Sequence, residues 1–99
     1  MNFYITSKIY RRARRYIASA CPVALLFNAR FSLWTFVTSH SHTIAKNKKT
    51  GELFRFDNTL EIKRIISWWD FHRHPSDAAP TRRHRVYLSR EICERLLET

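Results

Sequence analysis

The sequence predicts a small α+β fold, in which a mostly antiparallel sheet packs against two to three helices in the order β-α-β-β-β-α-β-α. Three observations favour this class. The chain has 99 residues, the length of one ordinary domain, so we expect residues 1–99 to form a single basic domain. Apolar residues make up 44% of the chain and aromatic residues 14%, which is enough apolar surface to fold. Apolar positions recur at helical spacing in some segments and form short β-branched or aromatic runs in others.

The first third of the chain predicts a strand, a helix and a buried connection. Residues 3–5 form a short apolar run, and Ser7 is a suitable N-cap for a helix over about residues 8–20. Pro22 lacks a backbone donor and ends that helix. Residues 23–27 are apolar without a period, which predicts a buried connection or a short strand. The apolar stripe of the helix consists of Ile9, Ala13, Tyr16, Ile17 and Ala20.

The middle of the chain predicts three strands. Residues 31–38 are rich in aromatic and β-branched residues, and because both faces are apolar we expect this strand to be central in the sheet. Residues 43–45 and 53–56 flank a turn at residues 46–51, which predicts a hairpin with a basic tip. Gly51 stands where this turn requires a left-handed residue.

The last part of the chain predicts two helices and a strand. Asn58 as N-cap and Glu61 at the third helical position approximate a capping box, for a helix that runs to about Phe71. A strand at residues 85–88 leads to a final helix capped by Ser89. The inward positions are Ile62, Ile65, Ile66 and Trp69 in the first helix and Ile92, Cys93, Leu96 and Leu97 in the second.

Positive charge is unevenly distributed along the chain. The net charge is +10, and no acidic residue precedes Glu52. Such a field attracts phosphate backbones, anionic membrane surfaces or acidic partner proteins. Four arginines crowd one face of the predicted first helix, where their mutual repulsion costs helix stability unless anions bind there. The candidate partner-binding or phosphate-binding residues are Arg11, Arg12, Arg14 and Arg15 on this helix, Lys46, Lys48 and Lys49 at the hairpin tip, and Arg82, Arg83 and Arg85 near the last strand.

The sequence shows no constellation typical of catalysis or of cofactor binding. Its single glycine excludes the glycine-rich loops that cradle phosphates. The eight acidic residues are scattered, and the paired histidines (His40 with His42, His72 with His74) lack the further motif of a zinc site. We therefore expect a protein that is not an enzyme, with no catalytic residue, metal, cofactor or small-molecule substrate. A small ribonuclease of the bacterial toxin type remains the enzyme alternative, because such proteins are short and basic.

The chain carries no legible signature of a helix-turn-helix, zinc finger or RNA-recognition domain. Residues 87–96 slightly resemble the opening helix of winged-helix excisionases, but no recognition helix follows them, so we expect no sequence-specific readout. The chain resembles small early proteins of temperate phages, which are also single domains with an uneven charge distribution and no catalytic motif. Within that group the chain resembles the phage inhibitors of the host exonuclease V complex, RecBCD. Anti-CRISPR proteins have the same character.

This resemblance implies a small basic protein that docks on a host nucleic-acid-processing enzyme, a nuclease or helicase such as RecBCD, and inhibits or modulates it. A direct, sequence-nonspecific DNA-binding or RNA-binding protein is the alternative. The implied location is the cytoplasm of the bacterial host. The uncharged run at residues 17–27 has the layout of a signal peptide, but Pro22 interrupts it and it is too short to span a membrane, so we expect no membrane partner.

Residues 72–83 predict a flexible surface loop, because they contain two prolines and no apolar period. His74 precedes Pro75, and Pro80 forms the second X-Pro bond; such bonds exchange slowly between cis and trans. The loop is also basic, so we expect it to be a second contact that orders on binding. A host prolyl isomerase acting on this loop is a further candidate partner.

Overall fold

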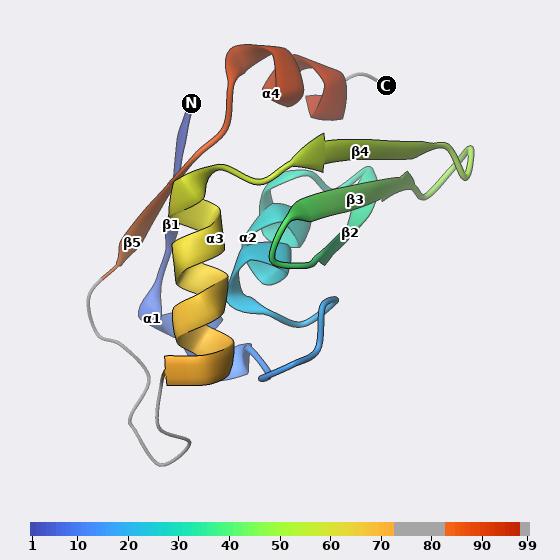
Figure 1. The fold of residues 1–99 in the computed structure, drawn as a ribbon. Helices are drawn as coiled ribbons and strands as arrows, with labels where there is room; N and C mark the ends of the chain where they lie inside the picture. The colour runs from blue at the N-terminus through green and yellow to red at the C-terminus, as the bar shows by residue number, and fades with distance from the viewer. Residues whose placement is uncertain (73–82, 98–99) are drawn as a thin grey trace.

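The computed structural model describes residues 1–72 and 83–97 and confirms the predicted α+β class (Figure 1). The buried apolar side chains form one cluster, and helix α2 packs against β1, β2, α1 and α3. The strands are β1 (Asn2–Ile5), β2 (Trp34–Thr38), β3 (His42–Asn47), β4 (Leu53–Asp57) and β5 (His84–Tyr87). The helices are α1 (Ser7–Arg12), α2 (Pro22–Arg30), α3 (Leu60–Ser67), which continues as the π-helical turn η1 (Trp68–His72), and α4 (Arg90–Leu97).

The described strands divide into two antiparallel sheets rather than one. β1 pairs with β5, which places Phe3 opposite Val86, and the second sheet has the order β2-β3-β4. β2 is therefore an edge strand and not the central strand that the sequence predicted. Trp34 and Phe36 point into the core, whereas Val37 is exposed on the other face. The prediction was wrong because a β-branched residue favours any strand, including one that is open to solvent on one face.

The first helix is much shorter than the predicted range 8–20. Its N-cap is Thr6 and it ends at Arg12. The chain then forms a loop that leads to α2, and the Thr38 N–H at the end of β2 donates to the Ala18 carbonyl at 3.0 Å. Tertiary hydrogen bonds of this kind replace the helical ones, and repulsion between neighbouring arginines weakens the helical alternative.

Residues 23–27 belong to helix α2, so the predicted connection or strand was wrong. Pro22 occupies the first helical turn, where its missing N–H has no helical acceptor in any case. Cys21 is the N-cap, and its Sγ accepts from the Ala24 N–H at 3.4 Å. The helix shows no apolar period because neighbours cover it on several sides. No helix in the described part of the chain, α2 included, is long and apolar enough to cross a membrane.

The predicted hairpin is confirmed. β3 and β4 are antiparallel neighbours, with Ile44 opposite Arg55. The side-chain oxygen of Asn47 accepts from the Lys49 N–H at 2.9 Å and thereby closes the turn. Gly51 has a φ of +76°, the left-handed conformation that the turn was expected to require.

Asn58 stabilises a buried polar network instead of capping α3. Its side-chain oxygen accepts from the Thr43 hydroxyl at 2.7 Å, and its Nδ2 donates to the Ser39 carbonyl, also at 2.7 Å. The N-cap of α3 is Thr59, whose hydroxyl accepts from the Ile62 N–H at 3.2 Å. The N-cap is thus one residue later than predicted, because Asn58 finds partners inside the β2-β3 turn. The predicted capping box does not form, since Ile62 and not Glu61 is then the third helical residue and the Glu61 carboxylate accepts from the Tyr87 N–H instead.

The predicted inward stripes of the last two helices are mostly confirmed. Ser89 caps α4, and its hydroxyl accepts from the Ile92 N–H at 3.3 Å. Leu97, the last residue of α4, is exposed, contrary to the prediction. In the other predicted positions, Ile62, Ile66 and Trp69 of the α3 segment and Cys93 and Leu96 of α4 are buried, while Ile65 and Ile92 are half-buried.

Candidate nucleic-acid interface

Tyr10 fixes α1 to the rest of the fold. Its ring is buried between Trp68 and Trp69, at 5.9 and 5.5 Å between ring centres. Its hydroxyl lies 2.5 Å from Nδ1 of His84, at the start of β5. Burial raises the pKa of Tyr10 well above its usual range, so the hydroxyl stays protonated. The inner side of α1 is thus held against two distant segments, and its other side faces solvent.

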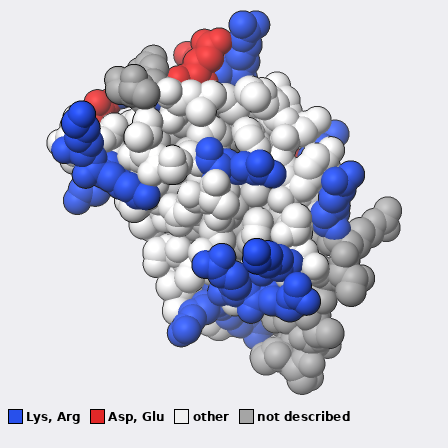
Figure 2. All heavy atoms as spheres, turned by 180° about the vertical axis from the view of Figure 1, so that it is seen from behind, with Lys and Arg blue, Asp and Glu red and all other residues white. Residues whose placement is uncertain are grey.

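Exposed cations cluster on the solvent side of α1 and at Arg14, two residues beyond the end of the helix. Arg11 and Arg12 lie in the last turn of the helix, where positive charge interacts favourably with the helix dipole. Figure 2 shows Lys and Arg side chains gathered at this end of the molecule. Within residues 1–72 and 83–97, Lys8, Arg11, Arg12 and Arg14 form no ion pair. We call this cluster the basic end; its members Lys8, Arg11, Arg12 and Arg14 are all exposed.

The residues after the basic end adopt an unusual backbone. Tyr16 has a φ of +61°, which bulky side chains rarely adopt. Its N–H donates to the carboxylate of Asp70, a residue of η1, at 3.0 Å. Arg15 lies half-buried beside it, and its Nε donates to the Trp69 carbonyl at 3.2 Å. These two contacts hold the loop against the end of α3 and turn the Tyr16 ring outward.

Two aromatic rings are exposed next to the basic end. Tyr16 and Phe71 are 65% and 67% exposed, and their ring centres lie 5.7 Å apart. The Arg15 guanidinium carbon lies 5.6 Å from the centre of the Tyr16 ring. Exposed apolar groups that gather beside charge mark interaction sites more often than isolated ones do. Such rings can stack on bases while neighbouring cations contact phosphates. We call Tyr16 and Phe71 the aromatic pair.

The sequence reasoning missed the aromatic pair. It placed Tyr16 on the inward stripe of a long helix and Phe71 at the end of another. A signal for Phe71 was present, because Phe71 follows the inward position Trp69 by two residues, which is about 200° around a helix and therefore on the opposite face. No sequence pattern reveals the left-handed turn at Tyr16, which depends on Asp70 fifty-four positions later.

The hairpin tip does not join the basic end. Lys46 is exposed near the end of β3, and Lys48 and Lys49 are exposed in the turn that follows. Figure 1 shows the β3-β4 turn at the opposite end of the molecule from α1. The four arginines of the predicted first helix and the three lysines of the hairpin, which the sequence marked as one possible surface, therefore lie in two separate basic regions.

The remaining predicted contacts lie near β5 or outside the described residues. The Arg83 guanidinium carbon lies 4.3 Å from the centre of the Tyr4 ring. Arg85 forms an ion pair with Glu61 at 3.5 Å. Arg82 and the proline-loop residues His74, Pro75 and Pro80 lie outside the described residues, so the predicted flexible loop stays a prediction.

The described residues offer little support for a metal or a nucleophile. Among residues 1–72 and 83–97, no three His, Cys, Asp or Glu side chains lie together as metal ligands would. His42 directs its Nδ1 toward the Ser41 hydroxyl at 2.9 Å. Cys21 and Cys93 are reduced and buried, and burial raises the pKa of both thiols. A thiol with a raised pKa carries little of the thiolate that attacks substrates or binds metals.

Comparisons with protein-family models, with curated proteins and with solved structures found no match to this chain. The chemistry of the site itself is therefore the basis for assigning a function. That chemistry combines exposed arginines with two exposed rings at one end of the fold.

Proposed function

We propose that this protein binds single-stranded nucleic acid without sequence preference, through the basic end and the aromatic pair. The observation that carries the proposal is the contact of Arg15, Tyr16 and Phe71, which places two exposed rings beside one arginine and, in sequence, directly after the basic end. Arginines suit phosphate because their planar guanidinium forms paired hydrogen bonds. Rings stack only on bases that are free of a duplex, so a single strand fits this surface better than a double helix.

The absence of sequence preference follows from the same chemistry. Every base has a flat face that an aromatic ring can stack on, and phosphates are identical along a strand. The first half of the chain, which includes the basic end, has no acidic residue before Glu52, and the carboxylate that reaches this surface from a distant segment, Asp70, accepts a hydrogen bond from the Tyr16 N–H. Affinity should therefore fall steeply with salt, because each phosphate contact releases counterions from the strand.

The salt dependence of oligonucleotide binding tests the cationic half of the proposal. The combined variant R11Q/R12Q/R14Q removes three exposed charges from the basic end, and Arg15 is kept because it contacts the Trp69 carbonyl. With oligo-dT as probe and fluorescence anisotropy as readout, we expect the slope of log K against log salt to shrink by about 2. The matched control K46Q/K48Q/K49Q loses the same charge at the hairpin tip. Equal losses in the two variants would mean that net charge alone drives binding, and would contradict the proposed site.

Substitution of the aromatic pair tests the stacking half. We expect Y16S and F71S each to weaken oligo-dT binding by about 1–3 kcal/mol, or roughly 5- to 150-fold, without a change in salt slope. Leu53 is an equally exposed apolar residue on β4 and serves as the control, as L53S. Unchanged affinity in both ring variants would remove stacking from the mechanism and leave only charge.

The functions expected from the sequence need their own tests. Docking on a host nuclease or helicase such as RecBCD predicts a defined protein complex that survives nuclease treatment during affinity capture. Direct binding predicts that captured proteins are lost after the same treatment. The ribonuclease alternative predicts that the purified chain shortens a labelled RNA, and intact RNA after prolonged incubation would exclude it.

A further inference from the structure

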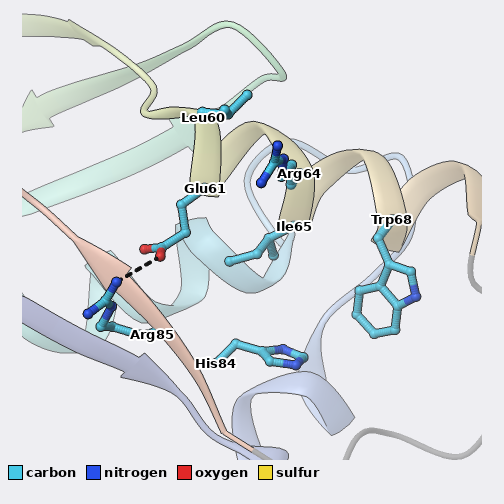
Figure 3. Close-up of a pocket in the computed structure, with 7 residues that line it drawn as sticks. All are labelled: Leu60, Glu61, Arg64, Ile65, Trp68, His84 and Arg85. Atoms are coloured by element: carbon cyan, nitrogen blue, oxygen red, sulfur yellow. Dashed lines mark ion pairs between the residues drawn. The ribbon is translucent and has the colours of Figure 1, made fainter.

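A groove of about 690 Å³ lies between α3 and β5 (Figure 3). Leu60 and Trp68 lie at its two ends and Ile65 between them. The volume is in the usual range of ligand pockets. Leu60 and Trp68 are eight positions apart, which corresponds to a rise of about 12 Å along the helix. The groove therefore has the length of roughly four residues of extended chain.

One wall of the groove is the edge of β5 that faces away from β1 and toward α3. Leu88 and Met1 exchange both of their backbone hydrogen bonds, at 2.9 and 2.5 Å. Because hydrogen-bonded pairs alternate along antiparallel strands, the backbone groups of Arg85 and Tyr87 point away from β1. The Tyr87 N–H accordingly donates to the Glu61 carboxylate on α3, at 3.1 Å. The Glu61 side chain, and not a neighbouring strand, thus satisfies the Tyr87 N–H on this edge of β5. A strand edge that pairs with no other strand is a template for a further strand.

The rim of the groove carries an excess of positive charge. Arg64 and Arg85 are its guanidinium groups, and Glu61 is the single carboxylate among the lining residues. The Arg85–Glu61 pair spans 3.5 Å, and its side chains are 58% and 35% exposed. Ion pairs this exposed contribute little, so an incoming carboxylate can replace Glu61 at small cost.

We propose that this groove binds an extended acidic peptide of a protein partner, which adds a strand beside β5. The Arg85 backbone presents a donor and an acceptor together, and a peptide group supplies the matching pair, whereas a phosphodiester offers acceptors alone. An apolar side chain of the peptide packs on Ile65 and Trp68, and its carboxylates pair with Arg64 and Arg85. This site does not depend on nucleic-acid binding at the basic end.

Selection from a displayed library of random peptides tests the proposal with the full chain as target. We expect the enriched peptides to carry Asp or Glu around an apolar residue. Labelled copies should bind R64Q/R85Q at least about tenfold more weakly than the unmodified protein. The matched control R30Q/R55Q loses the same charge from exposed positions outside the groove and should bind within about twofold. Circular dichroism checks that each variant is folded.

A change on the peptide side keeps the test independent of variant folding. N-methylation of the one peptide amide that pairs with Arg85 should weaken binding by about tenfold or more, because it removes the strand hydrogen bond. Tolerance of N-methylation at every peptide position would overturn strand addition. A library without any peptide that prefers the unmodified protein to R64Q/R85Q would overturn the site. Displacement of the peptide by oligo-dT would also overturn it, since the groove would then belong to the nucleic-acid surface.

Discussion

Replacing Trp34 tests how the three-stranded sheet is joined to the C-terminal helix. The Trp34 side chain on β2 has no exposed area, and its indole Nε1–H donates to the Leu96 carbonyl of α4 at 2.9 Å. The centre of the Trp34 ring lies 6.4 Å from the ring centre of Phe54 on β4 and 5.6 Å from the guanidinium carbon of Arg95 on α4. One side chain therefore connects β2, β4 and α4.

The structure sets the size of the expected loss. W34A removes the whole buried ring and leaves a cavity, which costs about 3–5 kcal/mol in the free energy of unfolding. W34F keeps much of the packing but leaves the Leu96 carbonyl without its donor, a loss of about 1–3 kcal/mol. A domain of this length has a total stability of about 5–15 kcal/mol, so the alanine variant should be close to unfolding at room temperature.

Urea denaturation followed by far-ultraviolet circular dichroism measures both losses. Leu33 precedes Trp34 and is exposed, so L33A provides the control and should change stability by less than about 0.5 kcal/mol. Unfolding of W34A and L33A at the same urea concentration would refute the role of the Trp34 ring in joining β2 to α4. An alanine variant that matches W34F would instead show that the cavity collapses and that the indole hydrogen bond accounts for the loss.

Three further predictions follow from single residues. Burial raises the pKa of Tyr10 above its usual value near 10. Above about pH 10 the unfolded chain therefore releases a proton that the folded chain keeps, so the free energy of unfolding should fall as the pH rises. The fall should be steeper than in Y10F by up to about 1.4 kcal/mol per pH unit, and denaturation at several pH values measures it. G51A should lower the free energy of unfolding by about 1 kcal/mol through backbone strain alone, because an added Cβ meets nothing within 4 Å at this φ of +76°. A loss near zero in urea denaturation would contradict the left-handed turn. Y16G should be at least as stable as the unmodified protein, since glycine accepts a φ of +61°, yet it should bind oligo-dT more weakly. A large drop in the urea midpoint of unfolding would give Tyr16 a structural role instead.

The sequence by itself determined the elements whose signals are local. The hairpin of β3 and β4 depends on alternation around a turn that Asn47 and Gly51 close within a few residues. The inward faces of α3 and α4 follow from helical spacing, and the Ser89 cap lies three residues before its partner. The cations of the basic end were equally visible, because their number and the absence of nearby acids are properties of composition.

Only the tertiary structure decided the path of residues 13–30 and the chemistry of both proposed surfaces. The helix expected to continue past Arg12 ends there, because Asp70 and Thr38 supply hydrogen-bond partners from distant segments. The same Asp70 contact holds Tyr16 beside Phe71, and the pairing of the two terminal strands directs the Arg85 backbone into its groove. Such long-range contacts leave no periodic trace in the sequence, since each depends on where another segment packs and not on neighbouring residues.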